Sequence, residues 1–414
     1  MKTLWKAVIA LIAAGLIFSL SGVLMGASRW IYWDKSGPQV VASSEEKRIT
    51  ELDLAQIENI DIDANFSDVE FIKSDKYGID IRYYDADVSW SLSDGNLKIN
   101  FDVQTRNRYF GINLSFNYPS NYIKVYLPAD VALGAVSIKA DSGEIKIGDF
   151  RAGDVRISNS FGKLDTDSIT CNKLRIEMSS CDFAGKNLSV SGDIEYKNTF
   201  GSTKFETINA KNFTLRSESG DVTIRGCDVE GLDIQNTFGR LDIYSITCNK
   251  LQIEMNACDF LGKDLSVSGD ILYKNRFGES KFETVTAKNF VLDSNAGDVT
   301  VKGCSVEGID IKNTFGKITA RNLVSYKTDI DAGSTEIDVS GTFWGQTVIN
   351  NTFDDIRFTT SKAREDYTYD LSTVFGDVVI DGDKGRSSTH GGNASENSLE
   401  ITNSNGNIRV YFAK

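Results

Sequence analysis

The sequence predicts an all-β fold, a parallel β-solenoid built of three-sided coils, preceded by one N-terminal transmembrane helix. Three observations predict this architecture. A block of 77 residues occurs twice in a row, at 159–235 and 236–312, and a period of about 19 residues runs beneath it. Apolar residues recur in pairs two positions apart, which is the spacing of side chains on one face of a β-strand. The N-terminal segment contains an uncharged stretch long enough to cross a bilayer.

Residues 1–33 form the predicted membrane anchor. Residues 7–28 carry no charge, and a helix of that length spans roughly 33 Å at ~1.5 Å per residue, close to the thickness of a bilayer core. Aromatic residues flank both ends, as at membrane interfaces: Trp5, Trp30, Tyr32 and Trp33. A cleaved signal peptide is the alternative, with Gly26 and Ser28 as small residues near a candidate cut. We expect an uncleaved single-pass anchor, a cell-membrane location and an extracytoplasmic C-terminal domain.

The segments that follow the anchor differ in regularity. Residues 34–48 are polar and charged and are predicted to form a stalk. Residues 49–122 alternate apolar and polar side chains with irregular loops, and are predicted to be N-terminal coils that cap the solenoid. Residues 123–414 are predicted to form the regular β-solenoid, which contains the 77-residue duplication.

One residue per period, which we call the marker position, sets the register of the coils. The markers are Gly143, Gly162, Cys181, Gly201, Gly220, Gly239, Cys258, Gly278, Gly297, Gly316, Thr335 and Asp354, then Gly376 and Gly406 after longer steps. Apolar or small residues follow most markers at offsets 2 and 4, 7 and 9, and 12 and 14. Three such pairs predict three short strands per coil, because a helix needs a spacing near 3.6. At ~4.8 Å per coil, about 15 coils make a rod on the order of 70 Å long.

The residue before each marker alternates between large and small. Phenylalanine stands there at Phe161, Phe200, Phe238, Phe277, Phe315 and Phe353, and serine or alanine in the coils between. This alternation predicts rings in the interior that interleave between neighbouring coils. Asparagine occurs three residues before the marker in the same alternate coils, where it could bond its own turn or a neighbour along the stack. The predicted physical unit is therefore two coils.

The composition argues against several kinds of chemistry. The net charge of −13 disfavours a nucleic-acid partner, and the chain has a single histidine, His390.

The six cysteines are predicted to be buried small hydrophobes, with Cys227 and Cys248 as the closest candidate for a disulfide pair. Acidic residues follow many markers, and we expect solvated turns rather than a calcium row, since the motif GGxGxD is missing: Glu144, Asp221, Asp298 and Asp377. No catalytic, cofactor-binding or metal-binding residue is predicted, and we expect no cofactor.

Breaks in the repeat are better candidates for binding than the repeat itself. Residues 383–397 are predicted to form a mobile corner loop, and the last coil, around Gly406, is predicted to leave an open edge. Residues 105–122 gather Arg106, Arg108 and several aromatics, which could contact glycans or lipid headgroups or simply cover the cap. Phe343 and Trp344 resemble a surface aromatic patch, although the offset of Trp344 favours the core.

The chain resembles the bacterial β-strand-repeat family called "putative adhesins", a domain of unknown function, as a membrane-anchored member. The resemblance rests on the strand YIKVYLPADV at 122–131 and on serial turns such as DSGEIKI, VSGDIEY and ESGDVTI. It covers residues 50–414 and implies no catalytic residues. We therefore expect a membrane-anchored adhesive, structural or interaction module of the cell envelope, not an enzyme, with envelope proteins or surface glycans as partners. A glycan- or cell-wall-active enzyme and an accessory or sensor component of an envelope-stress system are the alternatives.

Overall fold

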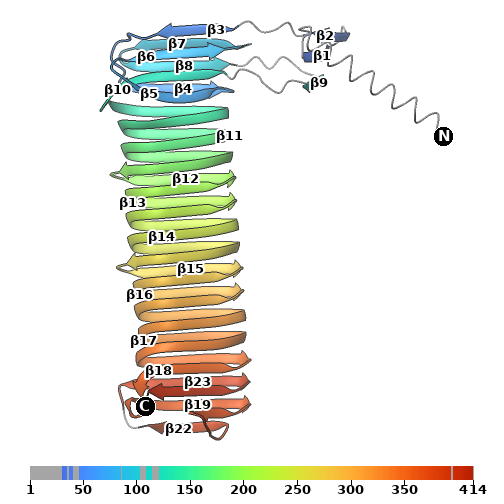
Figure 1. Cartoon of the computed structure of the whole chain (residues 1–414), viewed down its shortest axis with the longest axis vertical. Helices are drawn as coiled ribbons and strands as arrows, with labels where there is room; N and C mark the ends of the chain where they lie inside the picture. Colours follow the sequence, from blue (N-terminus) through green and yellow to red (C-terminus); the bar gives the residue numbers. More distant parts are fainter. Residues whose placement is uncertain are drawn as a thin grey trace, which may run out of the picture.

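The computed structural model describes residues 30–34, 37–40, 46–84, 86–102, 109–113, 121–392 and 395–413. The described residues of 46–102 and 121–413 form one straight rod (Figure 1). The all-β solenoid prediction is confirmed. Three further strands form a small separate sheet: β1 (Trp30–Asp34), β2 (Gly37–Val40) and β9 (Tyr109–Asn113).

The middle of the rod is a stack of parallel coils. Its strands are β11 (Ala132–Val190), β12 (Asp193–Phe200), β13 (Thr203–Ser219), β14 (Val222–Val267), β15 (Asp270–Phe277), β16 (Ser280–Ala296) and β17 (Val299–Phe353). β13 pairs with β14 along three successive segments, where each residue lies opposite the one 19 positions later. Ile208 thus faces Cys227, and Phe213 faces Leu232. The predicted 19-residue coil with three strands is present in this pairing.

Many coils turn two of their corners with left-handed backbone. The first is the marker, where Gly220 has φ +136° and a Cβ would lie 2.1 Å from the Gly201 carbonyl oxygen of the neighbouring coil. That approach explains why glycine recurs there. The second corner lies six residues later, at positions such as Ser168, Asn187 and Gly226, and a Cβ at Gly226 would make only an ordinary contact, 3.8 Å from the Thr207 backbone. The strands between corners point their paired apolar side chains into one continuous core.

The N-terminal end is stacked out of chain order. Its strands are β3 (Lys47–Glu51), β4 (Asn59–Asn65), β5 (Asp68–Ser74), β6 (Gly78–Tyr83), β7 (Asp87–Ser93), β8 (Asn96–Asp102) and β10 (Tyr122–Pro128). β4 and β5 form a coil that pairs in parallel with β11 on one side and with β8 and β10 on the other. β3, β6 and β7 then add antiparallel strands at the outside, which end the parallel stack.

The C-terminal end is also stacked out of chain order. Its elements are β18 (Ile356–Ala363), the short 3-10 helix η1 (Arg364–Asp366), β19 (Tyr367–Phe375), β20 (Val378–Ile380), β21 (Asp383–Lys384), β22 (Ser388–Gly392), β23 (Asn397–Asn405) and β24 (Ile408–Ala413). The last coil, β23 and β24, pairs with β17 and β18 on one side and with β19 and β20 on the other. The chain therefore ends inside the stack, and the prediction that its final coil leaves an open edge is wrong.

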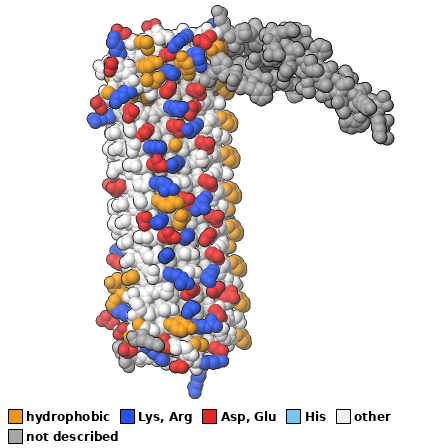
Figure 2. Space-filling model, in the orientation of Figure 1, with side chains coloured by type: hydrophobic (Ala, Val, Ile, Leu, Met, Phe, Trp, Pro, Cys, Tyr) orange, Lys and Arg blue, Asp and Glu red, His pale blue; other side chains and the backbone are white. Residues whose placement is uncertain are grey.

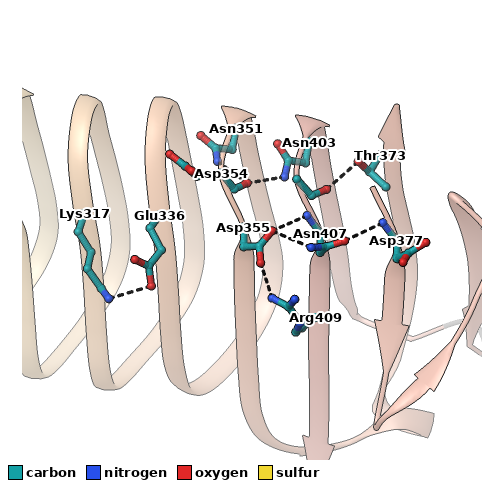
Figure 3. Close-up of polar contacts among 11 residues, drawn as sticks. Lys317, Glu336, Asn351, Asp354, Asp355, Thr373, Asp377, Asn403, Asn407 and Arg409 are labelled. Atoms are coloured by element: carbon teal, nitrogen blue, oxygen red, sulfur yellow. Dashed lines mark hydrogen bonds and ion pairs between the residues drawn. The ribbon is translucent and has the colours of Figure 1, made fainter. Parts of the chain in front are cut away.

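Polar side chains fasten this inserted coil to both neighbours (Figure 3). The Asp355 carboxylate of the inner neighbour accepts the backbone N–H and the side-chain amide of Asn407, and it pairs with Arg409 at 2.6 Å. On the outer side, the Asn407 side chain accepts the backbone N–H of Asp377. Each coil boundary at this end thus carries side-chain bonds in addition to the strand pairing.

The predictions for the N-terminal segments have different outcomes. The predicted anchor, residues 1–33, falls mainly on residues 1–29, which lie outside the described residues, and its last part, residues 30–33, lies in β1 (Trp30–Asp34) and not in a helix. Within the described ranges, no helix is apolar and long enough to cross a membrane. The stalk prediction is wrong at its end, because Lys47 and Arg48 already belong to β3 of the rod.

Candidate functional site

A column of exposed phenylalanines runs along one edge of the rod. These side chains are 49% to 72% exposed, and we call them the phenylalanine ladder and each ring a rung: Phe66, Phe161, Phe200, Phe238, Phe277, Phe315, Phe353 and Phe375. Figure 2 shows a column of hydrophobic side chains along one edge, interrupted by other atoms at regular intervals. The prediction that these rings lie in the interior is wrong, whereas their alternation with small residues is present.

The rings point outward because the chain turns a corner where they stand. Along the strand before the corner, every second side chain points inward, and the last of these is the asparagine three residues before the marker. Asn198, for example, is fully buried. The chain then bends toward the left-handed marker glycine, Gly201, and the intervening Phe200 projects into solvent. A strict two-residue alternation across the corner would have placed that ring inside.

The ladder alternates strictly in space, including at the two ends. Phe200 and Phe238 both lie opposite Ser219, and Phe277 lies opposite Ala257 and Ala296. At the C-terminal end, Asn405 of the inserted coil lies between Phe353 and Phe375. Rungs are therefore two coils apart, about 9.6 Å at ~4.8 Å per coil. The small residues between rungs, which we call notches, are Ser142, Ser180, Ser219, Ala257, Ala296, Ser334 and Asn405.

Buried asparagines hold the corner behind the rungs. The side-chain amide of Asn198 donates to the Cys181 carbonyl of the neighbouring coil at 2.9 Å, and Asn275 makes the equivalent bond to Cys258 at 2.8 Å. Of the two alternatives left open by the sequence, Asn198 and Asn275 bond the neighbouring coil, whereas Asn351 bonds both the neighbouring coil and its own turn. These bonds satisfy carbonyls that the corner leaves without a strand partner. They give most of the ladder a rigid support, because the backbone beneath most of the rings is fixed to the coil beside it.

The acidic residues after the markers also bind backbone. The carboxylate of Asp221 accepts the backbone N–H of Arg240, and that of Asp298 accepts the N–H of Lys317. The bond from the Ser202 N–H lowers the pKa of Asp182 below its ordinary value of 3.8. Glu144 and Asp377 pair instead with Lys146 and Lys384. Over the described residues, no group of three or more His, Cys, Asp or Glu side chains is arranged to hold a metal ion.

The cysteines lie in the core as free thiols, away from the ladder surface. All six are buried: Cys171, Cys181, Cys227, Cys248, Cys258 and Cys304. Burial raises the pKa of the Cys227 and Cys248 thiols to about 12, so they stay protonated at neutral pH. Their placement agrees with the prediction of small hydrophobic core residues.

The predicted loop at 383–397 is largely strand. β22 pairs antiparallel with β19, with Ser388 opposite Ser372, and β21 pairs with β20. His390 contacts Asp370 at 2.9 Å across this pairing. The extra residues thus cover the end of the rod, and the prediction of a mobile corner loop is wrong for the part described. Of the candidate segment 105–122, Arg106 and Arg108 lie outside the described residues, and 109–113 form β9.

A second aromatic cluster lies near the C-terminal end. Phe343 is fully buried, whereas Trp344 is 37% exposed and stacks on Tyr326 with ring centroids 6.3 Å apart. The Lys362 ammonium lies over the Trp344 ring at 3.1 Å from its centroid. The expectation that Trp344 belongs to the core is wrong, because this coil buries one residue, Phe343, where other coils bury the pair at offsets 7 and 9.

A shallow hollow of about 500 Å³ lies beside the first regular coils. Lysines line it together with carboxylates, and two of those lysines form ion pairs: Lys163 with Asp165 at 2.6 Å and Lys146 with Glu144 at 2.9 Å. Because the charges are balanced, this hollow offers no concentrated field for a charged ligand.

The comparisons with known proteins identify a family. A family model described as "Toastrack DUF4097" matches residues 57–271 and 263–411. A solved structure described as a "putative adhesin" from Bacteroides fragilis shares 15% identity, with 58% of this chain and 97% of that chain covered and a TM-score of 0.26. Another, a "putative cell adhesion protein" from Clostridium sporogenes, shares 8% identity, with 89% and 100% covered and a TM-score of 0.18. No curated protein matches the chain. Since the family model spans nearly the whole rod, the chain belongs to the Toastrack DUF4097 family.

Proposed function

We propose that the protein is a membrane-anchored, extracytoplasmic interaction rod of the bacterial envelope, and that it binds its partner along the phenylalanine ladder. The extent of the ladder carries this proposal. A phenylalanine side chain presents roughly 200 Å², so eight half-exposed rings leave on the order of 900 Å² of apolar surface in water. Smaller side chains separate the rings, so they are not one contiguous patch, but their alignment concentrates exposed apolar surface along one edge, and concentrated apolar surface marks interaction sites.

The support behind the ladder favours binding by a rigid surface. The asparagine bonds fix the backbone beneath the rings, so docking a partner costs little conformational entropy in the rod. The uncharged stretch at residues 7–28 is the basis for proposing the membrane anchor. Together these features fit a module that projects from the membrane and presents one long apolar edge.

A cell-adhesion experiment tests the proposed use of the ladder. Cells that produce the full chain should aggregate or adhere to surfaces more than cells that produce a triple variant, Phe200→Ser, Phe238→Ser and Phe277→Ser. The control is Tyr326→Ser, which removes an exposed aromatic side chain away from the ladder. Equal adhesion by the wild type and the triple variant, at equal surface amounts, would contradict the proposal.

Protease treatment of intact cells tests the proposed topology. A protease added outside should degrade the rod, while a tag placed before residue 1 should survive because the N-terminus is proposed to lie inside. Loss of the tag, or a protected rod after the cell wall has been opened, would contradict the proposed orientation.

A further inference from the structure

We propose that the phenylalanine ladder is a zipper between two copies of this chain, in which the rungs of one copy enter the notches of the other. This inference rests on the proposed function and names its partner, a second copy. The two rods lie side by side with their ladders facing, offset along their axes by one coil. Such a contact uses the same patch on both copies, as in the twofold interfaces of most homodimers.

The spacing of the rungs is the first argument. Neighbouring rungs are about 9.6 Å apart, which is two strand spacings, and only a small side chain such as Ser219 or Ala257 lies between them. A ring inserted midway would lie about 4.8 Å from each neighbour, within the 4.5–7 Å range of favourable aromatic pairs. A second ladder has the same period along its full length, so all rungs except one at the end meet a notch.

Other polymers fit this period less well. Side chains on one face of an extended peptide recur about every 6.8 Å, so a bound strand would lose register within two rungs. The alternation also continues through the end coils, whose sequences lie outside the repeat. Phe66 of the N-terminal coil and Asn405 of the inserted C-terminal coil both keep the large–small order. The period is thus a property of the whole edge.

The exposed area is the second argument. A stable interface of standard size buries about 800 Å² on each partner, and the ladder offers on the order of 900 Å² of apolar surface per copy. A rod shorter by half would fall below that size. The length of the repeat and the area required for a stable dimer therefore agree.

The charges beside the ladder are the third argument. The position two residues before the marker is small and uncharged in most coils: Ser160, Ser179, Thr199, Thr237, Asn256, Asn295, Thr314 and Thr352. In the same row charges occur at Asp141, Glu218 and Arg276. Two copies with a net charge of −13 each repel one another over most of their surfaces. On this side of the ladder they can approach with little like-charge contact, whereas carboxylates such as Asp221 and Asp298 follow the markers on the other side.

Sedimentation equilibrium of the full chain in a non-ionic detergent, over a range of protein concentrations, tests the zipper. The wild type and the control Tyr326→Ser should dimerise. The rung-removing triple variant, Phe200→Ser, Phe238→Ser and Phe277→Ser, should raise the dimer Kd by at least about 100-fold. A notch-filling variant, Ser219→Arg with Ala257→Arg, keeps every ring and should raise the Kd by a similar factor because it blocks insertion. Circular dichroism of each variant establishes that the rod is folded.

Photo-crosslinking in intact cells is a second test of the zipper. A small diazirine amino acid at position 219 should cross-link two copies, and the cross-link should lie in a peptide that contains a rung. The same group at position 326 should form no cross-link between copies. A wild-type chain that stays monomeric and forms no such cross-link overturns the zipper. So does a dimer that the notch-filling variant leaves unchanged.

The two proposals fail in different ways. If the chain is monomeric but the rung-removing variant abolishes cell adhesion, the ladder binds another occupant, such as a surface glycan. In that case the zipper is wrong and the proposed function stands. If neither adhesion nor dimerisation responds to the ladder variants, both proposals are wrong.

Discussion

At the scale of single residues, each coil is held to the next by polar side chains that reach one strand spacing along the rod. Asn198 and Asn275 bond carbonyls at marker positions, and carboxylates such as Asp221 bond N–H groups of the next coil. These groups lie at corners, where strand pairing is interrupted. Their loss leaves backbone groups unpaired, and a buried unpaired group is costly.

Asn198→Ala should therefore destabilise the rod locally. The substitution removes the bond to the buried Cys181 carbonyl, and an unsatisfied buried acceptor costs about 1–3 kcal/mol. Urea unfolding should report the loss, and native-state hydrogen exchange should place it in the coils around residue 198. Asn209→Ala, at an exposed position, should change stability by less than about 0.5 kcal/mol. Equal effects of the two substitutions would contradict this role of the asparagine.

Asp80 in the N-terminal cap should make stability depend on pH. Its buried carboxylate accepts two bonds from Arg48, at 2.8 and 2.7 Å, and one from Tyr122. The bond from Arg48 is the main cause that holds the pKa of Asp80 below its ordinary value of 3.8. Because the folded pKa is depressed, this stabilisation is present above about pH 4 and is lost as the pH falls through the folded pKa.

The measurement is the melting temperature of the full chain and of Asp80→Asn between pH 7 and pH 3. The variant should melt lower than the wild type at pH 7, and the difference should shrink below pH 4 because the wild-type carboxylate becomes protonated. Asp53→Asn, at a side chain that is 80% exposed, is the control and should show little difference at either pH. A difference for Asp80→Asn that does not change with pH would contradict the assignment.

At the scale of elements, the two ends of the rod are closed by coils that lie out of chain order. β23 and β24 form a coil that separates β17 and β18 from β19 and β20, and β4 and β5 occupy the equivalent place at the other end. Antiparallel strands outside these coils end the parallel stack. Terminal units that differ from the repeat are the general requirement of a solenoid, since an uncovered coil would expose core and strand edge.

Deletion of residues 393–414, which contain β23 and β24, should release the outermost coil. β19 and β20 would lose the parallel neighbours that join them to the rod, so their amides should exchange rapidly. Amides in β14–β16 should keep their protection and serve as the internal control. Retained protection in β19 and β20 would mean that they stack directly on β18, as a sequential solenoid requires, and would contradict the observed order.

At the scale of the whole molecule, the rod behaves as a one-dimensional stack in which each coil contacts its neighbours. Two coils form the structural unit, because the asparagines and the phenylalanine rungs occur on alternate coils. The 77-residue duplication is four coils, which is two such units. The length of the rod can therefore change in steps of this block without changing any contact between coils.

Deletion of residues 236–312 should give a shorter rod with the same fold. The deletion joins Gln235 to Asn313, which is the equivalent of Asn236, and keeps the alternation of the ladder. The rod should shorten by four coils, about 19 Å, which small-angle X-ray scattering can measure. Deletion of residues 236–305 removes a fractional number of coils, disrupts the register and should prevent folding. Two deletions that fold equally well would show that coil register is unimportant.

The sequence by itself determined the architecture of the rod. The pairs of apolar residues, the 19-residue period and the alternation at Phe200 and Ser219 predicted parallel three-strand coils and a two-coil unit, because all three depend on local periodicity. It also predicted the buried cysteines. The same local reasoning failed at corners, where the chain changes direction: the rungs were expected inside, and so was Trp344.

Only the tertiary structure decided where the ends of the chain lie and which way the rings point. The insertion of β23 and β24 depends on contacts between residues about 30 and 52 positions apart, such as Gly376 with Gly406 and Asn351 with Asn403. A 19-residue period cannot predict pairing over such sequence separations. The exposure of the ladder depends on the left-handed corner at the marker glycines. The full apolar edge therefore arises only when the coils are stacked, because coils that lie out of chain order complete its alternation at both ends.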